Sequence, residues 1–275
     1  MILVALTLLA PQLAGATLFL NGWGVDPAAG HWLPDGSTPG GTPGIVRFTL
    51  GDEASRATYA PGNFVGPGWG GQPFDADALY VGADSRFLYL ALITGTPPGG
   101  APDPWRRDVY APGDLFLDIG GDGCWDLAID VSSGQAVYNA AGFRATDLEQ
   151  TAYFAQSNPF RLKPGKRGEA EDLGADFSYA AFYGTELGHA YRVQANNAPG
   201  PWLADFYALE IKLPWSAFGG ELGRLRGEDY TLHWTMGCGN DVIEQRGELP
   251  VPEPSTLALV GTALVGLAGL RRRAK

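Results

Sequence analysis

Residues 114–131 read DLFLDIGGDGCWDLAIDV, and this stretch decides the fold. Its two halves, Asp114–Ile119 and Trp125–Val131, carry an apolar side chain at every second position, which is the period of a β-strand that buries one face. The segment between them is rich in glycine, which favours a tight turn between two strands. The stretch therefore predicts an antiparallel β-hairpin.

The length of the turn decides which side chains face one another across this hairpin. A two-residue turn would place Leu117 opposite Asp126 and mix the faces. A three-residue turn, Gly121–Gly123, pairs Leu117 with Leu127 and leaves one face wholly apolar. Because the buried face sets the register, we expect the three-residue turn, with Gly123 at positive φ. The other expected pairs on the apolar face are Leu115 with Ile129 and Ile119 with Trp125.

The same register gathers acidic residues on the opposite face. The four are Asp114, Asp118, Asp126 and Asp130. Like charges directly across a strand pair are destabilising, so this face needs an explanation. Water and salt can screen the charges, an arginine such as Arg106 or Arg107 can pair with them, or a calcium ion can bind them through its preference for oxygen ligands. Further oxygen donors for such an ion are Asp75, Asp77, Asn240 and Asp241.

Apolar runs of strand length recur between turns, and the 40 Gly and 21 Pro make up about 22% of the 275 residues. Phe87–Thr94 is apolar on both faces, which predicts an interior strand covered on both sides. The segment Pro214–Phe218 predicts a single helical turn. The other expected strands are Ile45–Leu50, Ala78–Val81, Phe206–Leu213 and Tyr230–Met236. We expect a mainly β fold, a single β-sandwich of jelly-roll or immunoglobulin-like type with long Gly/Pro loops, over residues 17–250.

The N-terminus carries an apolar run, Met1–Ala10, followed by small residues at Ala14 and Ala16. This order is typical of a secretory signal peptide cleaved after Ala16, although no basic residue precedes the run. A buried N-terminal strand or helix is the alternative. We expect residues 1–16 to be a signal peptide.

The C-terminus has three parts in a fixed order. Pro252-Glu253-Pro254 precedes a largely apolar stretch of 15 residues, Thr256–Leu270, and a basic stop follows. The stop is made of Arg271, Arg272 and Arg273. The apolar stretch is short against the roughly 20 residues that span a bilayer, and the arginines are expected to stay on the cytoplasmic side. An ordinary C-terminal membrane anchor is the alternative.

This order of parts resembles the PEP-CTERM sorting signal of Gram-negative bacteria, over residues 251–275. The resemblance implies that an exosortase, a membrane cysteine protease-transpeptidase, recognises Pro252-Glu253-Pro254 and removes the apolar helix after a transient stage in the inner membrane. It also implies export to the cell surface or extracellular matrix, in a context of exopolysaccharide production.

Charge excludes one class of partner. The chain has 19 Lys and Arg against 30 Asp and Glu, a net charge of −11. Taking away the four basic residues and the one acidic residue of 251–275 leaves 15 against 29, or −14, for residues 17–250. No basic excess is available to neutralise phosphates, which excludes nucleic acid on bulk electrostatics. No HExxH, GxSxG or phosphate-loop motif is present either.

A more distant resemblance concerns the domain between the two ends. Its segments are Ala78-Leu-Tyr80, Leu88-Tyr-Leu90, Glu210-Ile-Lys-Leu-Pro-Trp215 and Asn240-Asp241. They are similar to family 9 carbohydrate-binding modules and DOMON-like domains. The resemblance implies a β-sandwich, and some such domains bind sugars or calcium.

Cys124 and Cys238 lie in a domain that we expect to be exported, where thiols oxidise. A disulfide between them would close a loop of just over 110 residues, worth about 4–5 kcal/mol in the chain-entropy model. Two separate thiols are one alternative, and Cys238 as a nucleophile served by His233 is another. Residues five apart on a strand point to opposite faces, which argues against the nucleophile. We expect the disulfide.

Four tryptophans are candidates for stacking on sugar rings. They are Trp69, Trp105, Trp202 and Trp215. Trp69 lies between glycines, which argues for exposure, whereas aromatic side chains more often fill core sites. A glycosidase would need an acid and a base about 5–9 Å apart, and no pair in the sequence is marked by its surroundings as having a raised pKa.

The expected function is non-catalytic, that of an exported surface or extracellular-matrix protein associated with exopolysaccharide or biofilm. The alternative is a glycan-binding module, with or without calcium, and a secreted glycoside hydrolase is a third hypothesis. The expected partners are the exosortase, transiently the inner membrane, and extracellular polysaccharide.

Overall fold

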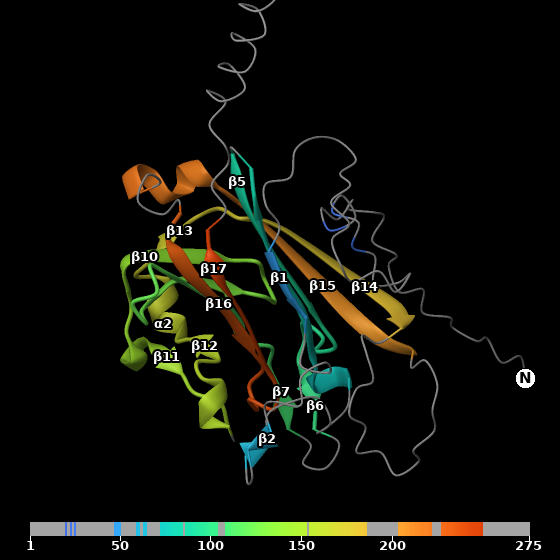
Figure 1. The fold of residues 1–275 in the computed structure, drawn as a ribbon. Coiled ribbons are helices and arrows are strands. Elements are labelled where there is room, and N and C mark those ends of the chain that lie inside the picture. The colour runs from blue at the N-terminus through green and yellow to red at the C-terminus, as the bar shows by residue number, and fades with distance from the viewer. Residues whose placement is uncertain are drawn as a thin grey trace, which may run out of the picture.

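A computed structural model gives the architecture of the chain (Figure 1). The residues that it describes are 20, 23, 25, 47–50, 59–60, 63–64, 72–84, 86–103, 108–152, 154–185, 203–221 and 227–249. The predicted signal peptide, the segment 251–275 and the candidates Trp69, Trp105 and Trp202 lie outside these residues. Within the described ranges, no helix has the length and hydropathy to cross a membrane.

Two antiparallel sheets make up most of the described chain. The five-stranded sheet has the order β1 (Arg47–Leu50), β4 (Ala76–Ala83), β5 (Phe87–Thr94), β15 (Leu203–Pro214) and β14 (Asp176–Thr185). The six-stranded sheet has the order β13 (Glu171–Asp172), β10 (Ala136–Phe143), β9 (Trp125–Asp130), β8 (Asp114–Ile119), β16 (Asp229–Thr235) and β17 (Val242–Glu248). The expected mainly β fold is confirmed, and the jelly-roll or immunoglobulin-like type stays a prediction.

Shorter elements complete the described part. Three two-stranded ladders pair β2 (Tyr59–Ala60) with β3 (Asn63–Phe64), β6 (Ala101–Pro102) with β7 (Val109–Tyr110), and β11 (Leu148–Glu149) with β12 (Arg161–Leu162). The short helices are η4 (Gln72–Phe74), η5 (Ala145–Asp147), η6 (Ala155–Ser157), α2 (Pro164–Arg167) and η7 (Trp215–Glu221). The helical turn expected at Pro214–Phe218 is confirmed by η7.

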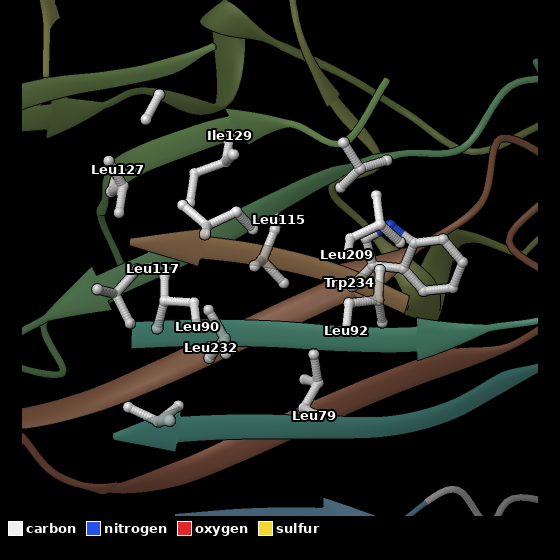
Figure 2. Close-up of a cluster of buried hydrophobic side chains, with 14 of the residues drawn as sticks. Leu79, Leu90, Leu92, Leu115, Leu117, Leu127, Ile129, Leu209, Leu232 and Trp234 are labelled. Atoms are coloured by element: carbon white, nitrogen blue, oxygen red, sulfur yellow. The ribbon is translucent and has the colours of Figure 1, made fainter. Parts of the chain in front are cut away.

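The main core lies between the two sheets. Figure 2 shows leucines of β4, β5 and β15 meeting side chains of β8, β9 and β16, and all of them belong to one buried cluster. The indole N–H of Trp234 in this cluster donates a hydrogen bond to the carbonyl of Gly113 (3.2 Å). Apolar alternation along each strand therefore builds one shared core, as the periodicity of the sequence predicts.

The hairpin of β8 and β9 has the register that the buried face demands. Leu117 faces Leu127 and Leu115 faces Ile129, and Gly123 has a φ of +83°. The ladder ends at Leu117, because the N–H of Ile119 donates to the carboxylate of Asp126 (2.7 Å) instead of continuing across the strands. The expected register is confirmed, whereas the expected ladder pair of Ile119 with Trp125 is not formed, and residues 120–124 connect β8 to β9.

Both sheets also have covered outer faces. On the five-stranded sheet, Leu20, Trp23 and Val25 pack over the outer side of β4, β5 and β15, and we call these three residues the N-terminal cover. This confirms that β5 is buried on both faces, since its leucines lie in the main core. On the six-stranded sheet, the described residues between 144 and 170, here named the cover segment, place Leu148, Leu162 and Ala170 over β8, β9 and β10. Figure 1 shows β11, β12 and α2 on the side of β16 away from β15.

Candidate functional site

Asp114 is the most deeply buried of the four expected acidic residues. Its side chain is 2% exposed, and it accepts a hydrogen bond from the backbone N–H of Leu162 (2.7 Å). The guanidinium of Arg167, in the cover segment, forms an ion pair with it. Burial raises the pKa of Asp114 to about 7, and the charge of Arg167 opposes that rise. An arginine does pair with this face, but it is Arg167, and the suggested Arg106 and Arg107 lie outside the described residues.

The other three aspartates each hold a nearby turn. Asp118 accepts the N–H of Gly123 (3.0 Å), Asp126 accepts that of Ile119 (2.7 Å), and Asp130 accepts that of Ser132 (2.8 Å). Burial is the largest influence on Asp118 and raises its pKa, while the backbone N–H groups of Gly123, Asp122 and Gly121 oppose the rise. Among the described residues, no three His, Cys, Asp or Glu side chains lie where they could hold a metal ion. The calcium site at the four aspartates stays a prediction.

The four further oxygen donors, Asp75, Asp77, Asn240 and Asp241, are all buried. The carboxylate of Asp241, which is buried, accepts the N–H of Ala76 and its own neighbour's N–H at Val242, both at 2.7 Å. The hydroxyl of Thr235 donates to the carbonyl of Asp241 (2.5 Å). Asp241 thus links the start of β4 to the start of β17, so its carboxylate has a structural role.

The two cysteines are free thiols and do not form the expected disulfide. Cys124 follows the turn beside the first residues of β16, and Cys238 lies beyond the last residue of that strand. The seven residues of β16 span roughly 20 Å at about 3.3 Å per residue, whereas a disulfide needs Cα atoms within about 7 Å. Burial raises the pKa of Cys238 to about 11, and the charge of Asp122 raises that of Cys124. Neither thiol is prepared to act as a nucleophile.

Trp215, the one described member of the four candidate tryptophans, is a core residue. Its side chain is buried in η7, its ring packs near that of Phe218, and its indole N–H donates to the carbonyl of Asp84 (2.8 Å). It is therefore unavailable for stacking on a sugar.

A different tryptophan lies beside an accessible polar cluster. Trp125 is half-buried at the start of β9, an inner strand of the six-stranded sheet, with its ring 5.4 Å from that of His233 and 5.7 Å from that of Phe116. His233 faces Glu244 across the strands, and Arg246 follows two residues later on the same face. We call Trp125, Glu244 and Arg246 the Trp125 patch. The sequence pattern assigned Trp125 to the apolar inner face, but a register shift in β10 lies opposite it.

The buried ring of His233 affects the carboxyl of Glu244 in the Trp125 patch. One ring nitrogen lies 3.2 Å from the carboxylate of Glu244 and the other 2.9 Å from the carbonyl of Pro159, so both meet acceptors. This contact with His233 lowers the pKa of Glu244 to about 2 despite partial burial, and Arg246 (2.7 Å) adds to the effect. The patch thus offers an ionised carboxylate, a guanidinium and an indole, without a nucleophile.

Comparison with known proteins identifies the C-terminal segment. The family model of the PEP-CTERM protein-sorting motif matches residues 250–273. No curated protein matches the chain. The match confirms the resemblance drawn from Pro252-Glu253-Pro254, the apolar stretch and the basic stop, and it indicates an exported protein that an exosortase processes.

Proposed function

We propose that this chain is a non-catalytic protein of the cell surface or extracellular matrix of a Gram-negative bacterium, associated with exopolysaccharide. The observation that carries the proposal is the PEP-CTERM sorting motif at residues 250–273, which begins directly after Leu249, a buried residue of the main core. The motif indicates export and processing by an exosortase. The sequence therefore couples a two-sheet domain to a removable C-terminal address.

The described polar side chains support a non-catalytic role. A glycoside hydrolase needs two facing carboxylates, one of them with a raised pKa. Asp114 has such a pKa, but it lies under the cover segment against Arg167 and Leu162. Glu244, the accessible carboxylate, has a lowered pKa and already binds His233 and Arg246.

The sorting proposal is tested by replacing Glu253 with Ala in a host that carries an exosortase. We expect the variant to keep its C-terminal tail, which mass spectrometry of the membrane and extracellular fractions would detect. Glu248→Ala is the matched control, because Glu248 is an exposed acid five residues upstream at the end of β17. Normal trimming of Glu253→Ala would overturn the proposal.

A second candidate function is glycan binding, and the Trp125 patch favours it. Aromatic rings stack on the apolar faces of sugars, and charged planar groups exchange hydrogen bonds with sugar hydroxyls. In this patch the side chain of Arg246 is 72% exposed, and that of Glu244 is 36% exposed. The tryptophan and the charged pair therefore present both kinds of contact on one sheet face.

This candidate is tested by titrating the host's exopolysaccharide onto the protein. We expect saturable binding that weakens in Trp125→Ala and in Arg246→Ala, whereas Arg86→Ala keeps it, because Arg86 is exposed outside the patch. Arg246→Ala matters most, since its exposed side chain can be removed without opening the core. If no saturable binding is measured, glycan binding is refuted and only the structural role in the matrix stays as a proposal.

A further inference from the structure

The folded body ends close to the sorting motif. Leu249 is 1% exposed and belongs to the main core, and its backbone N–H donates to the carbonyl of Glu228 (2.8 Å). The match to the sorting motif begins at the next residue, 250. Only two residues therefore separate the last described core side chain from Pro252.

This short connection limits how an enzyme can reach the motif. An extended chain covers at most about 3.6 Å per residue, so the three steps from Leu249 to Pro252 reach roughly 11 Å. A folded body of roughly 160 residues, the number that the structure describes, has a radius of gyration of about 15 Å. An exosortase that holds the motif at the membrane therefore meets the folded domain directly, unless the chain upstream of the motif is released.

The end of β17 is built to be released at low cost. In the described part of the six-stranded sheet, β17 is an edge strand that pairs with β16 alone. Arg246 and Glu248 are exposed and Gly247 has no side chain, so Leu249 is the single buried anchor of this end. Peptide-cleaving and peptide-binding sites commonly take their ligands as extended strands, which this end already resembles.

We propose that the exosortase takes this chain with residues 246–249 detached from the sheet, so that docking of Leu249 competes with processing. This inference rests on the proposed function, because it assumes that an exosortase acts at the motif. The equilibrium between the docked and the detached last strand then sets the rate at which the exosortase removes the tail. A chain whose last strand is docked is not processed, and a chain whose last strand is detached is processed.

An engineered disulfide between β16 and β17, here named the staple, tests the inference. Asp229 faces Glu248, and both are exposed. The bond between Leu249 and Glu228 makes the 229–248 pair a non-hydrogen-bonded position, where Cα atoms lie about 4.5 Å apart, within the range of a disulfide. We expect Asp229→Cys/Glu248→Cys, made with Cys124→Ser to prevent mispairing, to be processed severalfold more slowly in the exosortase-bearing host. Asp229→Cys alone in the same background is the control.

A spacer makes the test specific. Six Gly and Ser residues inserted between Leu249 and residue 250 should restore the rate in the stapled protein, because they supply the free chain that the staple withholds. An unchanged rate in the stapled protein, or a slow rate that the spacer does not restore, would overturn the inference. Glu253→Ala separates the two proposals: if it blocks trimming while staple and spacer change nothing, the inference alone fails. If Glu253→Ala is trimmed normally, the proposed function fails.

Discussion

The outer faces of the two sheets are covered in different ways. On the five-stranded sheet, the N-terminal cover packs apolar side chains on apolar strands, and the N–H of Leu20 donates a buried hydrogen bond to Glu210 (2.7 Å). On the six-stranded sheet, the cover segment adds buried polar and charged contacts. They are Arg167 to Asp114, His233 to the carbonyl of Pro159, and Ser157 to the carbonyl of Gly239. The same need, to hide an outer apolar face, is met mainly by apolar packing on one side, and by apolar packing together with buried charge and hydrogen bonds on the other.

This difference predicts two responses to pH. Apolar burial does not depend on protonation, so the apolar contacts of the N-terminal cover should hold across the neutral range. The cover of the six-stranded sheet contains a carboxyl whose pKa is raised by burial and an ionised partner. Its stability should therefore change as that carboxyl titrates.

The largest expected effect is that of Arg167→Met. Removing the guanidinium leaves the carboxylate of Asp114 buried without its charge partner, which costs about 3–5 kcal/mol for a broken buried pair. The pKa of Asp114 is already raised to about 7 and should rise further in the variant. A protonated carboxyl is favoured in the folded state, so the unfolding free energy of the variant should fall as pH rises through that raised pKa. Urea unfolding at pH 5.5 and pH 8.5 would show a larger loss at pH 8.5.

Arg161→Met is the control for that experiment. Arg161 lies in the same cover segment, but its ion pair with Glu149 (2.6 Å) is partly exposed, with side chains 38% and 28% accessible. Exposed pairs contribute about 0–1 kcal/mol, so this variant should lose little stability at either pH. Equal losses for Arg167→Met at both pH values would show that packing, not charge, holds the cover segment.

The second prediction concerns the other face. A Cβ at Gly82 would lie 2.6 Å from Cζ2 of Trp23, so Gly82→Ala must displace the ring of the N-terminal cover. Such overpacking costs about 1–3 kcal/mol, and the loss should be the same at pH 5.5 and pH 8.5. Gly99→Ala is the matched control, because a Cβ there meets no atom within 4 Å. A pH-dependent loss in Gly82→Ala would erase the contrast between the two faces.

The sequence predicts the parts of this contrast that are local. The register of β8 and β9 follows from the apolar face of 18 consecutive residues, 114–131, and the interior position of β5 follows from apolar side chains on both its faces. The partner of Asp114 does not follow, because Arg167 is 53 residues away and belongs to a segment of short turns without periodicity. The face on which Trp125 lies does not follow from the local pattern either, because a register shift in the neighbouring strand β10 decides its surroundings.

The same locality explains the cysteines and the sorting motif. A disulfide cannot be inferred from the presence of two cysteines and an oxidising compartment, since the distance between them is set by the length of β16. The sorting motif, by contrast, is a linear signal of motif, apolar stretch and basic stop. Residues 251–275 therefore suffice to predict it, and the family model matches it at 250–273.

The smallest expected effect tests whether backbone groups or an ion offset the charge on the six-stranded sheet. Oδ2 of Asp118 accepts the N–H of Gly123, whereas Oδ1 is buried without a hydrogen-bond partner, so Asp118 is where an ion would act first. Calcium needs several converging oxygens, and no three acidic side chains of the described residues converge. We therefore expect the difference in Tm between millimolar calcium and EGTA to be the same in the wild type and in Asp118→Asn.

Asp108→Asn is the control, because Asp108 is an exposed acid that precedes the hairpin in the sequence. A calcium-induced rise in Tm that Asp118→Asn abolishes and Asp108→Asn keeps would mean that the native state binds the ion at this hairpin. The outer face of the six-stranded sheet would then be held by a metal as well as by Arg167, and its contrast with the apolar face would be sharper still.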